Sequence, residues 1–287
     1  MRIYQAWAVE HPEEVAQGAG PFTTRAKRRL AGGATAIWES RTARKRGTLS
    51  IRSTGQEAAV LRSADAATLT RLRRLNAIAS GAFAVGGGLF ALSAALTQLG
   101  VTGPTASASI YFAGGLFFNT GGYTSLLQTI NAPRRSTDGA SLLARPWRWW
   151  RYAPRRIDWL SAFVLFAGTL VFGINLLNSF LQGLTAHQAN RLIWTPDIIG
   201  CVLFLISGHL AIAEVCHGRP CWCTRSLAWW IVYVNQVGSL LFMVSALAAF
   251  TRPETGSLIN ADIANWGTFA GALCFSLGGL LQFRERP

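Results

Sequence analysis

Six apolar stretches run through this chain, and each is long enough to cross a lipid bilayer. A helix needs roughly 17–25 mostly apolar residues to span about 30 Å of hydrocarbon. Lipid offers no hydrogen-bond partner to an unpaired backbone, so each stretch is predicted to be helical. Only 14% of the 287 residues are charged, against about 25% in soluble domains, which argues against six buried helices of a soluble protein. The stretches are residues 77–99, 106–130, 159–182, 198–217, 227–250 and 262–283.

Each stretch carries a similar eight-residue phrase that begins with Gly and a small residue. Leu or Val stands third, Phe stands fifth in all but the first phrase, and a small or short polar residue stands eighth. The phrases are GGLFALSA from Gly87, GGLFFNTG from Gly114, GTLVFGIN from Gly168, GCVLFLIS from Gly200, GSLLFMVS from Gly238 and GALCFSLG from Gly271.

The phrase predicts close helix packing. Positions one, five and eight share one helical stripe, because a turn takes 3.6 residues. Helices in lipid associate through small residues that let them approach closely. We therefore expect Phe of one helix to cover Gly of an antiparallel neighbour. The phrase also falls near mid-bilayer, where transporters often bind their substrates, so a binding site there is the alternative.

The six stretches group into three tandem antiparallel hairpins, at about 76–130, 157–217 and 226–283. Pro-containing turns join the helices within each hairpin, and the long segment 131–156 separates the first hairpin from the second. The predicted fold is thus an all-α membrane protein with six transmembrane helices in residues 76–287, built as an internal repeat.

Residues 1–75 form a separate basic region, which is expected to be partly disordered or helical. It has no apolar run of secretory-signal length. Its Lys and Arg residues gather in two clusters, around Arg28 and around Lys45. Contact with anionic lipids fits this composition. Nucleic acid is not expected as a partner, because no recognisable binding module accompanies the charge.

The distribution of charge predicts the orientation in the membrane. Of the 27 Lys and Arg residues, all but Arg191 and Arg252 fall in the N-terminal region, in the segments 131–156 and 218–226, or in the C-terminal tail. Positive residues stay on the cytoplasmic side. The sequence therefore predicts a multi-pass protein of the bacterial plasma membrane with both termini in the cytoplasm.

Three polar residues within the spans are candidate ligand or proton-relay groups: Asn175, His209 and Glu214. Ionisable residues inside a membrane are costly and often functional. Glu214 shares the packing stripe of the fourth helix, seven residues beyond Ser207. A satisfied interior or interface pair is the simpler interpretation of Glu214, and an interhelical hydrogen bond is the simpler one of Asn175.

The segment EVCHGRPCWC supplies a candidate metal set: Cys216, His217, Cys221 and Cys223. Zinc usually takes four such ligands, often in CxxC pairs, and the spacing here is irregular. No cofactor is therefore expected, and zinc binding is kept as an alternative. A structural disulfide is not expected here, because the cytoplasm is reducing.

Enzyme motifs do not emerge from the sequence. It lacks a P-loop, HExxH and GxSxG, so no catalytic residue is predicted. A structural or accessory membrane protein is the first interpretation, with the bilayer as partner and a homo-oligomer or a protein partner left open. A small-solute or ion transporter is the second. A membrane enzyme or metal sensor that uses the Cys216–Cys223 loop is the third.

Four stretches carry a resemblance to a known family: RRIDWLSAFVLFAGTLVF from Arg155, WTPDIIGCVLFLISGHLAIAEVCHG from Trp194, SLAWWIVYVNQVGSLLF from Ser226 and GTFAGALCFSLGGLL from Gly267. Together they resemble YrhK-domain-like integral membrane proteins of high-GC Gram-positive bacteria. The resemblance covers roughly 76–283. It implies two-helix hairpins with a Gly-aliphatic-Phe core, and no reaction, ligand or catalytic residue.

Overall fold

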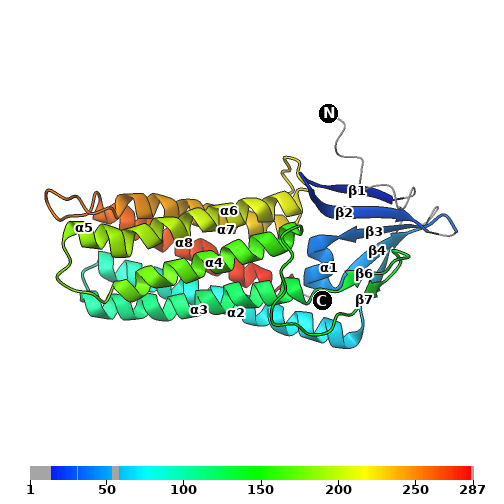
Figure 1. The fold of residues 1–287 in the computed structure, drawn as a ribbon, viewed down its shortest axis with the longest axis horizontal. Helices are drawn as coiled ribbons and strands as arrows, with labels where there is room; N and C mark the ends of the chain where they lie inside the picture. Colours follow the sequence, from blue (N-terminus) through cyan, green and yellow to red (C-terminus); the bar gives the residue numbers. More distant parts are fainter. Residues whose placement is uncertain (1–13, 31, 54–57, 286–287) are drawn as a thin grey trace.

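The computed structural model describes residues 14–30, 32–53 and 58–285. A bundle of long helices forms one end of the molecule and a small antiparallel sheet forms the other (Figure 1). The last described residues, after α8, lie at the sheet end of the bundle.

The sheet is a correction to the predicted all-α fold: in residues 14–30, 32–53 and 58–65, the described part of the N-terminal region, the chain forms β-strands and one short helix. Its five strands are hydrogen-bonded in sequence order, each antiparallel to the next. The strands are β1 (Glu14–Ala19), β2 (Phe22–Arg29), β3 (Thr35–Glu39), β4 (Thr48–Arg52) and β5 (Val60–Ser63), with a short helix α1 (Ser40–Arg46) between β3 and β4. Leu49 and Ile51 of β4 pack with Ala36, Ala43 and Ala64 in a small core, as the period-two side-chain alternation of a strand requires.

Six helices of more than 20 residues lie in the described ranges: α2 (Ala66–Gln98), α3 (Pro104–Ile130), α4 (Ile157–Asn178), α6 (Thr195–Val215), α7 (Leu227–Ala248) and α8 (Ala261–Gln282). The short helix α5 (Ala186–Ala189) and the π-helical turn η1 (Asn190–Trp194) lead into α6, and a small hairpin of β6 (Arg134–Arg135) and β7 (Leu142–Leu143) follows α3. The helix α2 begins ten residues before the predicted hairpin boundary, capped by Asp65, which accepts from the Thr68 N–H. Its first turns extend under the sheet (Figure 1).

Five of the long helices are long and apolar enough to cross a membrane by length and composition: α2, α4, α6 with its preceding turns, α7 and α8. The helix α3 is not among them. The chain is therefore a multi-pass integral membrane protein in its helical part.

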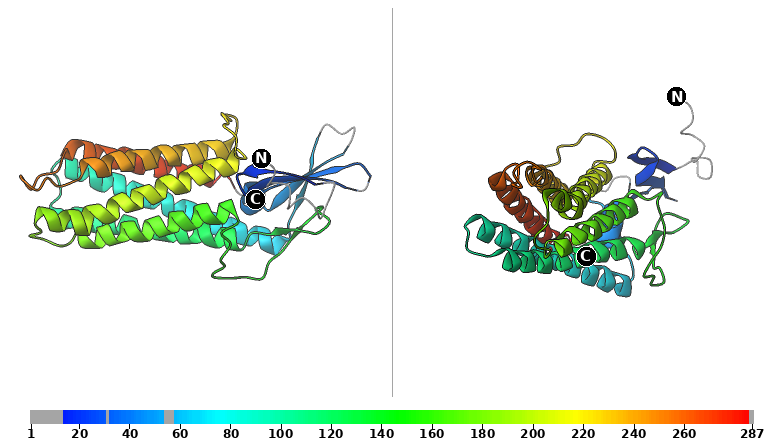
Figure 2. Two further views of the ribbon diagram at one scale, coloured as in Figure 1. Left: turned by 45° about the horizontal axis from the view of Figure 1, so that its top comes forward. Right: turned by 60° about the vertical axis from the view of Figure 1, so that its left-hand side comes forward.

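The long helices form a closed ring. The helix α2 packs against both α3 and α8, α4 packs against α3 and α6, and α7 packs against α6 and α8. Figure 2 shows the bundle from two further sides. The ring encloses an apolar core in which aromatic side chains predominate.

Phenylalanines of all six phrases meet in this core. Ring centroids lie 4.9 Å apart for Phe90 and Phe118, 6.0 Å for Phe172 and Phe204, and 5.3 Å for Phe242 and Phe275. Further contacts link the pairs across the ring, such as Phe118 with Phe275 at 5.6 Å. We call these six residues the Phe cluster: Phe90, Phe118, Phe172, Phe204, Phe242 and Phe275.

The expected cover of Gly by Phe is confirmed, and it is reciprocal within each pair of sequential helices. A Cβ atom at Gly114 would lie 2.8 Å from Phe90, and one at Gly86 would lie 2.7 Å from Phe118. The same holds for Gly168 with Phe204, Gly200 with Phe172, Gly238 with Phe275 and Gly271 with Phe242, all within 3.3 Å.

The first phrase matches the geometry of the other five when it is counted from Gly86 instead of Gly87. Gly87 packs against the backbone of α8 at Ala272, whereas Gly86 faces Phe118. Counting from Gly86 places Phe90 fifth, as in the other phrases.

Candidate functional site

The candidate site lies where α1 meets the sheet-side ends of the long helices (Figure 1). The helix α1 begins after Glu39 and ends at Gly47, whose φ of 64° is left-handed and whose N–H donates to the Ala43 carbonyl. Glycine adopts this conformation without strain. Three basic residues fill the last turn, Arg44, Lys45 and Arg46, where they also favour the negative end of the helix dipole.

Arg44 joins α1 to two transmembrane helices. Its Nη2 donates to Oε2 of Glu214, in the last turn of α6, at 2.9 Å, and its Nε lies 3.8 Å from Asp158 at the start of α4. Ser40 donates to the other Glu214 oxygen at 2.7 Å. Glu214 is 1% exposed. A buried carboxylate needs both charge and hydrogen-bond partners, and α1 supplies them.

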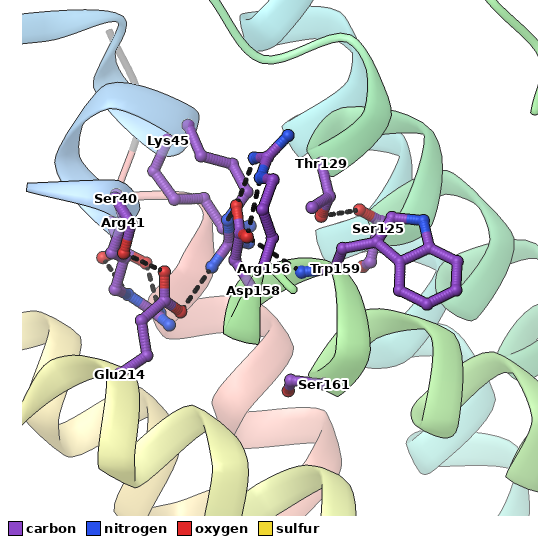
Figure 3. Close-up of polar contacts among 12 residues, drawn as sticks. Ser40, Arg41, Lys45, Ser125, Thr129, Arg156, Asp158, Trp159, Ser161 and Glu214 are labelled. Atoms are coloured by element: carbon purple, nitrogen blue, oxygen red, sulfur yellow. Dashed lines mark hydrogen bonds and ion pairs between the residues drawn. The ribbon is translucent and has the colours of Figure 1, made fainter. Parts of the chain in front are cut away.

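Asp158 has a second cationic partner on its own segment. Arg156 Nη2 donates to Oδ2 of Asp158 at 2.5 Å, and the Trp159 N–H donates to Oδ1 at 2.9 Å (Figure 3). Asp158 therefore contacts an arginine of its own segment, Arg156, as well as Arg44 of the N-terminal region.

A third carboxylate follows α8. Arg41 donates to both oxygens of Glu285, each at 2.7 Å. Burial raises the pKa of Glu285, yet the Arg41 charge and its paired hydrogen bonds outweigh burial and hold that pKa below its ordinary value. The α1 helix therefore contacts the ends of α4, α6 and α8 through bonded charges.

Lys45 has a different kind of partner. Its Nζ donates to Asn76 Oδ1 of α2 at 3.0 Å, and Asn76 Nδ2 donates to the Gln282 carbonyl of α8 at 2.8 Å. Among the described residues, no carboxylate lies within 4.0 Å of Lys45. Burial, followed by the charge of Arg44, lowers the pKa of Lys45 well below its ordinary value.

Two cavities lie on either side of α1. The inner cavity, here called the chamber, holds about 100 Å³ between α1 and the Phe cluster, and Phe204 and Phe275 line its far wall. The outer cavity, here called the vestibule, holds about 380 Å³ between α1 and the α6–α7 connection. Arg41 and Lys45 border both cavities.

The three predicted ligand or relay residues do not come together. Glu214 joins the α1 contacts, whereas His209 is exposed on the outer face of α6. Asn175 is buried toward the opposite end of α4, where its Oδ1 accepts from Ser179. The simpler interpretation of Glu214, a satisfied interface pair, fits these contacts.

The Cys216–Cys223 loop also differs from expectation. Cys216 and Cys221 form a disulfide, against our prediction of none, because the turn after α6 brings their Cα atoms to 5.5 Å. Cys223 is free and exposed. The described residues contain no group of three or more His, Cys, Asp or Glu side chains placed to hold a metal ion.

His217 turns toward the sheet. It has a left-handed φ of 52°, and its Nδ1 lies 2.8 Å from the Thr24 hydroxyl of β2. Burial lowers the pKa of His217, with the charge of Glu39 acting in the opposite direction. The loop thus adds a second contact between the sheet and the bundle.

Sequence reasoning missed most of the residues that hold α1. Ser40 and Glu285 were not singled out, and Arg41, Arg44 and Lys45 were treated only as part of a basic region. One signal was present: a carboxylate stands at the sheet-side end of three apolar stretches, as Asp158, Glu214 and Glu285.

Comparisons with known proteins add no relative. A scan against family models found no match, and searches of curated proteins and of solved structures found none.

Proposed function

We propose that this protein is a non-conducting, non-catalytic membrane bundle that holds its N-terminal sheet domain at one face of the bilayer, in a structural or accessory role. The observation that carries the proposal is the set of buried ion pairs from α1 to three helix ends, at 2.9 Å for Arg44 with Glu214 and 2.7 Å for Arg41 with Glu285. The Phe cluster fills the bundle interior beyond them.

The proposal includes six transmembrane helices in three hairpins, with α3 as the least apolar span. The helix α3 has no charged residue and packs between α2 and α4. Its exposed Ser109 and Thr120 hydroxyls donate to carbonyls one turn earlier, which satisfies the protons of these two hydroxyls within the helix. The shared Gly–Phe geometry supports an internal repeat, and the resemblance to YrhK-domain-like proteins stays a prediction.

We assign the sheet side to the cytoplasm by the excess of basic residues there. In that reducing compartment Cys216 and Cys221 would be held as thiols, and their disulfide would form in the purified protein. Exposed Cys223 tests this assignment. A membrane-impermeant maleimide added to intact cells should leave Cys223 unlabelled and should label a Glu254→Cys variant, since Glu254 lies on an exposed loop at the other end. Labelling of Cys223, with Glu254→Cys unlabelled, would reverse the orientation.

The role itself is tested by flux. Full-length protein in liposomes should give no leak of chloride, potassium or protons above protein-free vesicles, measured with entrapped dyes. Flux that disappears in the Lys45→Met variant would replace the accessory role by transport.

Transport is the second candidate because of one observation. The chamber is lined by Ser125, Ser161 and Asn235 and abuts the Phe cluster at Phe204 and Phe275. A cavity with polar side chains at this depth is where a transporter would hold a solute, and the side chains of the Phe cluster would then have to separate for passage.

A further inference from the structure

Side chains of opposite character line the two ends of the chamber. The Phe cluster forms its inner wall through Phe204 and Phe275, and α1 forms its outer wall through Arg41, Arg44 and Lys45. All six helices of the ring contribute lining residues with α1, so the chamber is a feature of the docked structure rather than of the sheet or the bundle alone.

Three buried nitrogen donors of residues that line the chamber have unused hydrogen-bonding capacity. Gln282 is 8% exposed and its Nε2 has no partner, and the Arg44 Nε likewise makes no hydrogen bond. Lys45 is 3% exposed, and one bond to Asn76 leaves two of its three ammonium protons unassigned. Buried donors without partners are costly, and all three belong to residues that line one cavity.

The charges around the chamber leave a cationic excess. Asp158 is paired with Arg156 and Arg44, Glu214 with Arg44, and Glu285 with Arg41. Each carboxylate is thus already bonded to an arginine, while Lys45 has no carboxylate within 4.0 Å among the described residues. A buried cation of this kind is stabilised by an anion or gives up its proton.

We infer that the chamber is a binding site for one small inorganic anion, held by the Lys45 ammonium together with the Gln282 Nε2 and Arg44 Nε donors, which make no hydrogen bond in the protein. This inference goes beyond the accessory role and does not depend on transport.

The size of the chamber limits the ligand class. Its volume of about 100 Å³ matches a few water-sized units of about 30 Å³ each. Chloride, nitrate or inorganic phosphate fits this space, whereas a nucleotide or an intact lipid headgroup exceeds it. The vestibule gives an approach path, since Arg46, His217 and Arg225 line it and Lys45 stands between the two cavities.

Binding is expected to be linked to a proton. Burial lowers the pKa of Lys45 well below its ordinary value, Arg44 and Arg41 add to this effect, and Glu285 and Glu214 oppose it. An anion beside the amine favours its charged form, so affinity should increase as the pH falls. The charged and titratable groups that line the two cavities with Lys45, or pair with those that do, are Glu39, Arg41, Arg44, Arg46, Arg156, Asp158, Glu214, His217, Arg225 and Glu285.

The test uses full-length protein in a neutral detergent and follows its melting temperature during titration with sodium chloride, nitrate or phosphate. Sodium gluconate keeps the ionic strength constant and is too large for the chamber. We expect a saturable rise in melting temperature with at least one of the three anions, with a lower half-saturating concentration at pH 6 than at pH 9.

The chain offers a matched pair of variants, because Lys27 and Lys45 are its two lysines. Lys45→Met should weaken binding at least tenfold, and Lys27→Met, in strand β2 of the sheet, should leave it unchanged. Gln282→Leu provides a second test that keeps every ion pair and should weaken binding several-fold. No saturable rise in the parent, or equal rises in the parent and in folded Lys45→Met, would overturn the site and leave the accessory role standing.

Discussion

The Arg44 guanidinium donates to the Glu214 carboxylate across 2.9 Å, although 170 residues separate the two in the chain. Arg44 belongs to a seven-residue helix of the N-terminal domain, and Glu214 to the last turn of a membrane helix. This pair, with Ser40 on the second oxygen, makes the N-terminal domain part of the bundle's end. The proposed docking of the N-terminal domain on the helix bundle depends on this contact.

Replacement of Glu214 by Gln should destabilise the protein strongly. Breaking a buried ion pair leaves an uncompensated charge and costs about 3–5 kcal/mol, here at a carboxylate that is 1% exposed. Thermal unfolding in detergent measures the loss. Glu254→Gln is the matched control, because Glu254 is exposed on the far loop, and its melting temperature should equal that of the parent.

Replacement of Gly114 by Ala should lower stability by about 1–3 kcal/mol, the usual cost of overpacking. The new methyl group would lie 2.8 Å from Phe90 and 3.1 Å from the Gly86 carbonyl. Gly88→Ala is the control, since nothing lies within 4 Å of its added Cβ. Leu at Gly168 or Gly238 should lower folded yield further. Equal melting of the Gly114→Ala and Gly88→Ala proteins would show that the Gly–Phe contact is not close-packed.

The Arg41–Glu285 pair should make the protein less stable in acid. The pKa of Glu285 is lower in the folded protein than its ordinary value, so the unfolded chain takes up a proton first as the pH falls. The stabilisation is therefore complete above about pH 4.5 and is lost as the pH falls through the folded pKa. Denaturation at several pH values should show a shallower acid decline for Glu285→Gln than for Glu254→Gln.

Lys45 should also make the free energy of unfolding depend on pH, between its lowered pKa in the folded protein and its ordinary pKa. Its pKa is lowered in the folded protein, so the unfolded chain holds more protons between that lowered value and the ordinary pKa of about 10.4. The free energy of unfolding should then rise with pH across this window. The Lys45→Met protein should lose this slope and the Lys27→Met protein should keep it; retention of the slope in Lys45→Met would assign it to another group.

The disulfide should contribute modestly to stability. Closing a loop between residues five apart in sequence removes chain entropy worth about 2 kcal/mol in the unfolded state. Reduction, or Cys221→Ser, should lower the melting temperature accordingly, whereas Cys223→Ser should not, because Cys223 is free. Peptide mapping without reductant identifies the linked pair, and a Cys221–Cys223 link would contradict the assignment.

The helical part of the fold could be read from the sequence because a bilayer imposes length and apolarity on its spans. The Gly-Phe phrase also predicted which side chains would meet, with the one-residue shift at Gly86. The phrase succeeds because close packing in lipid depends on small residues, and that requirement is local in sequence.

The sheet was missed because its strands are short and the longest of them, β2, is strongly basic. In β2, Thr24 and Ala26 point inward while Arg25 and Lys27 alternate with them, a period-two pattern that four arginines and lysines in eight residues obscured. The N-terminal charges were interpreted as a basic cytoplasmic region that could contact anionic lipids, yet Arg44 and Lys45 are buried. Their partners lie more than 100 residues away or on α2, and no local pattern encodes such pairings.

Hydrogen exchange measures whether α1 is docked on the helix bundle. A seven-residue helix is marginal by itself, so the protection of its amides reports docking on the bundle. We predict that amides from Ala43 to Arg46 in the full-length protein exchange as slowly as the sheet-side ends of α6 and α8, and that Glu214→Gln accelerates them at least tenfold. Exchange of these amides in the parent protein at the rate of the exposed loop around Glu254 would contradict the account.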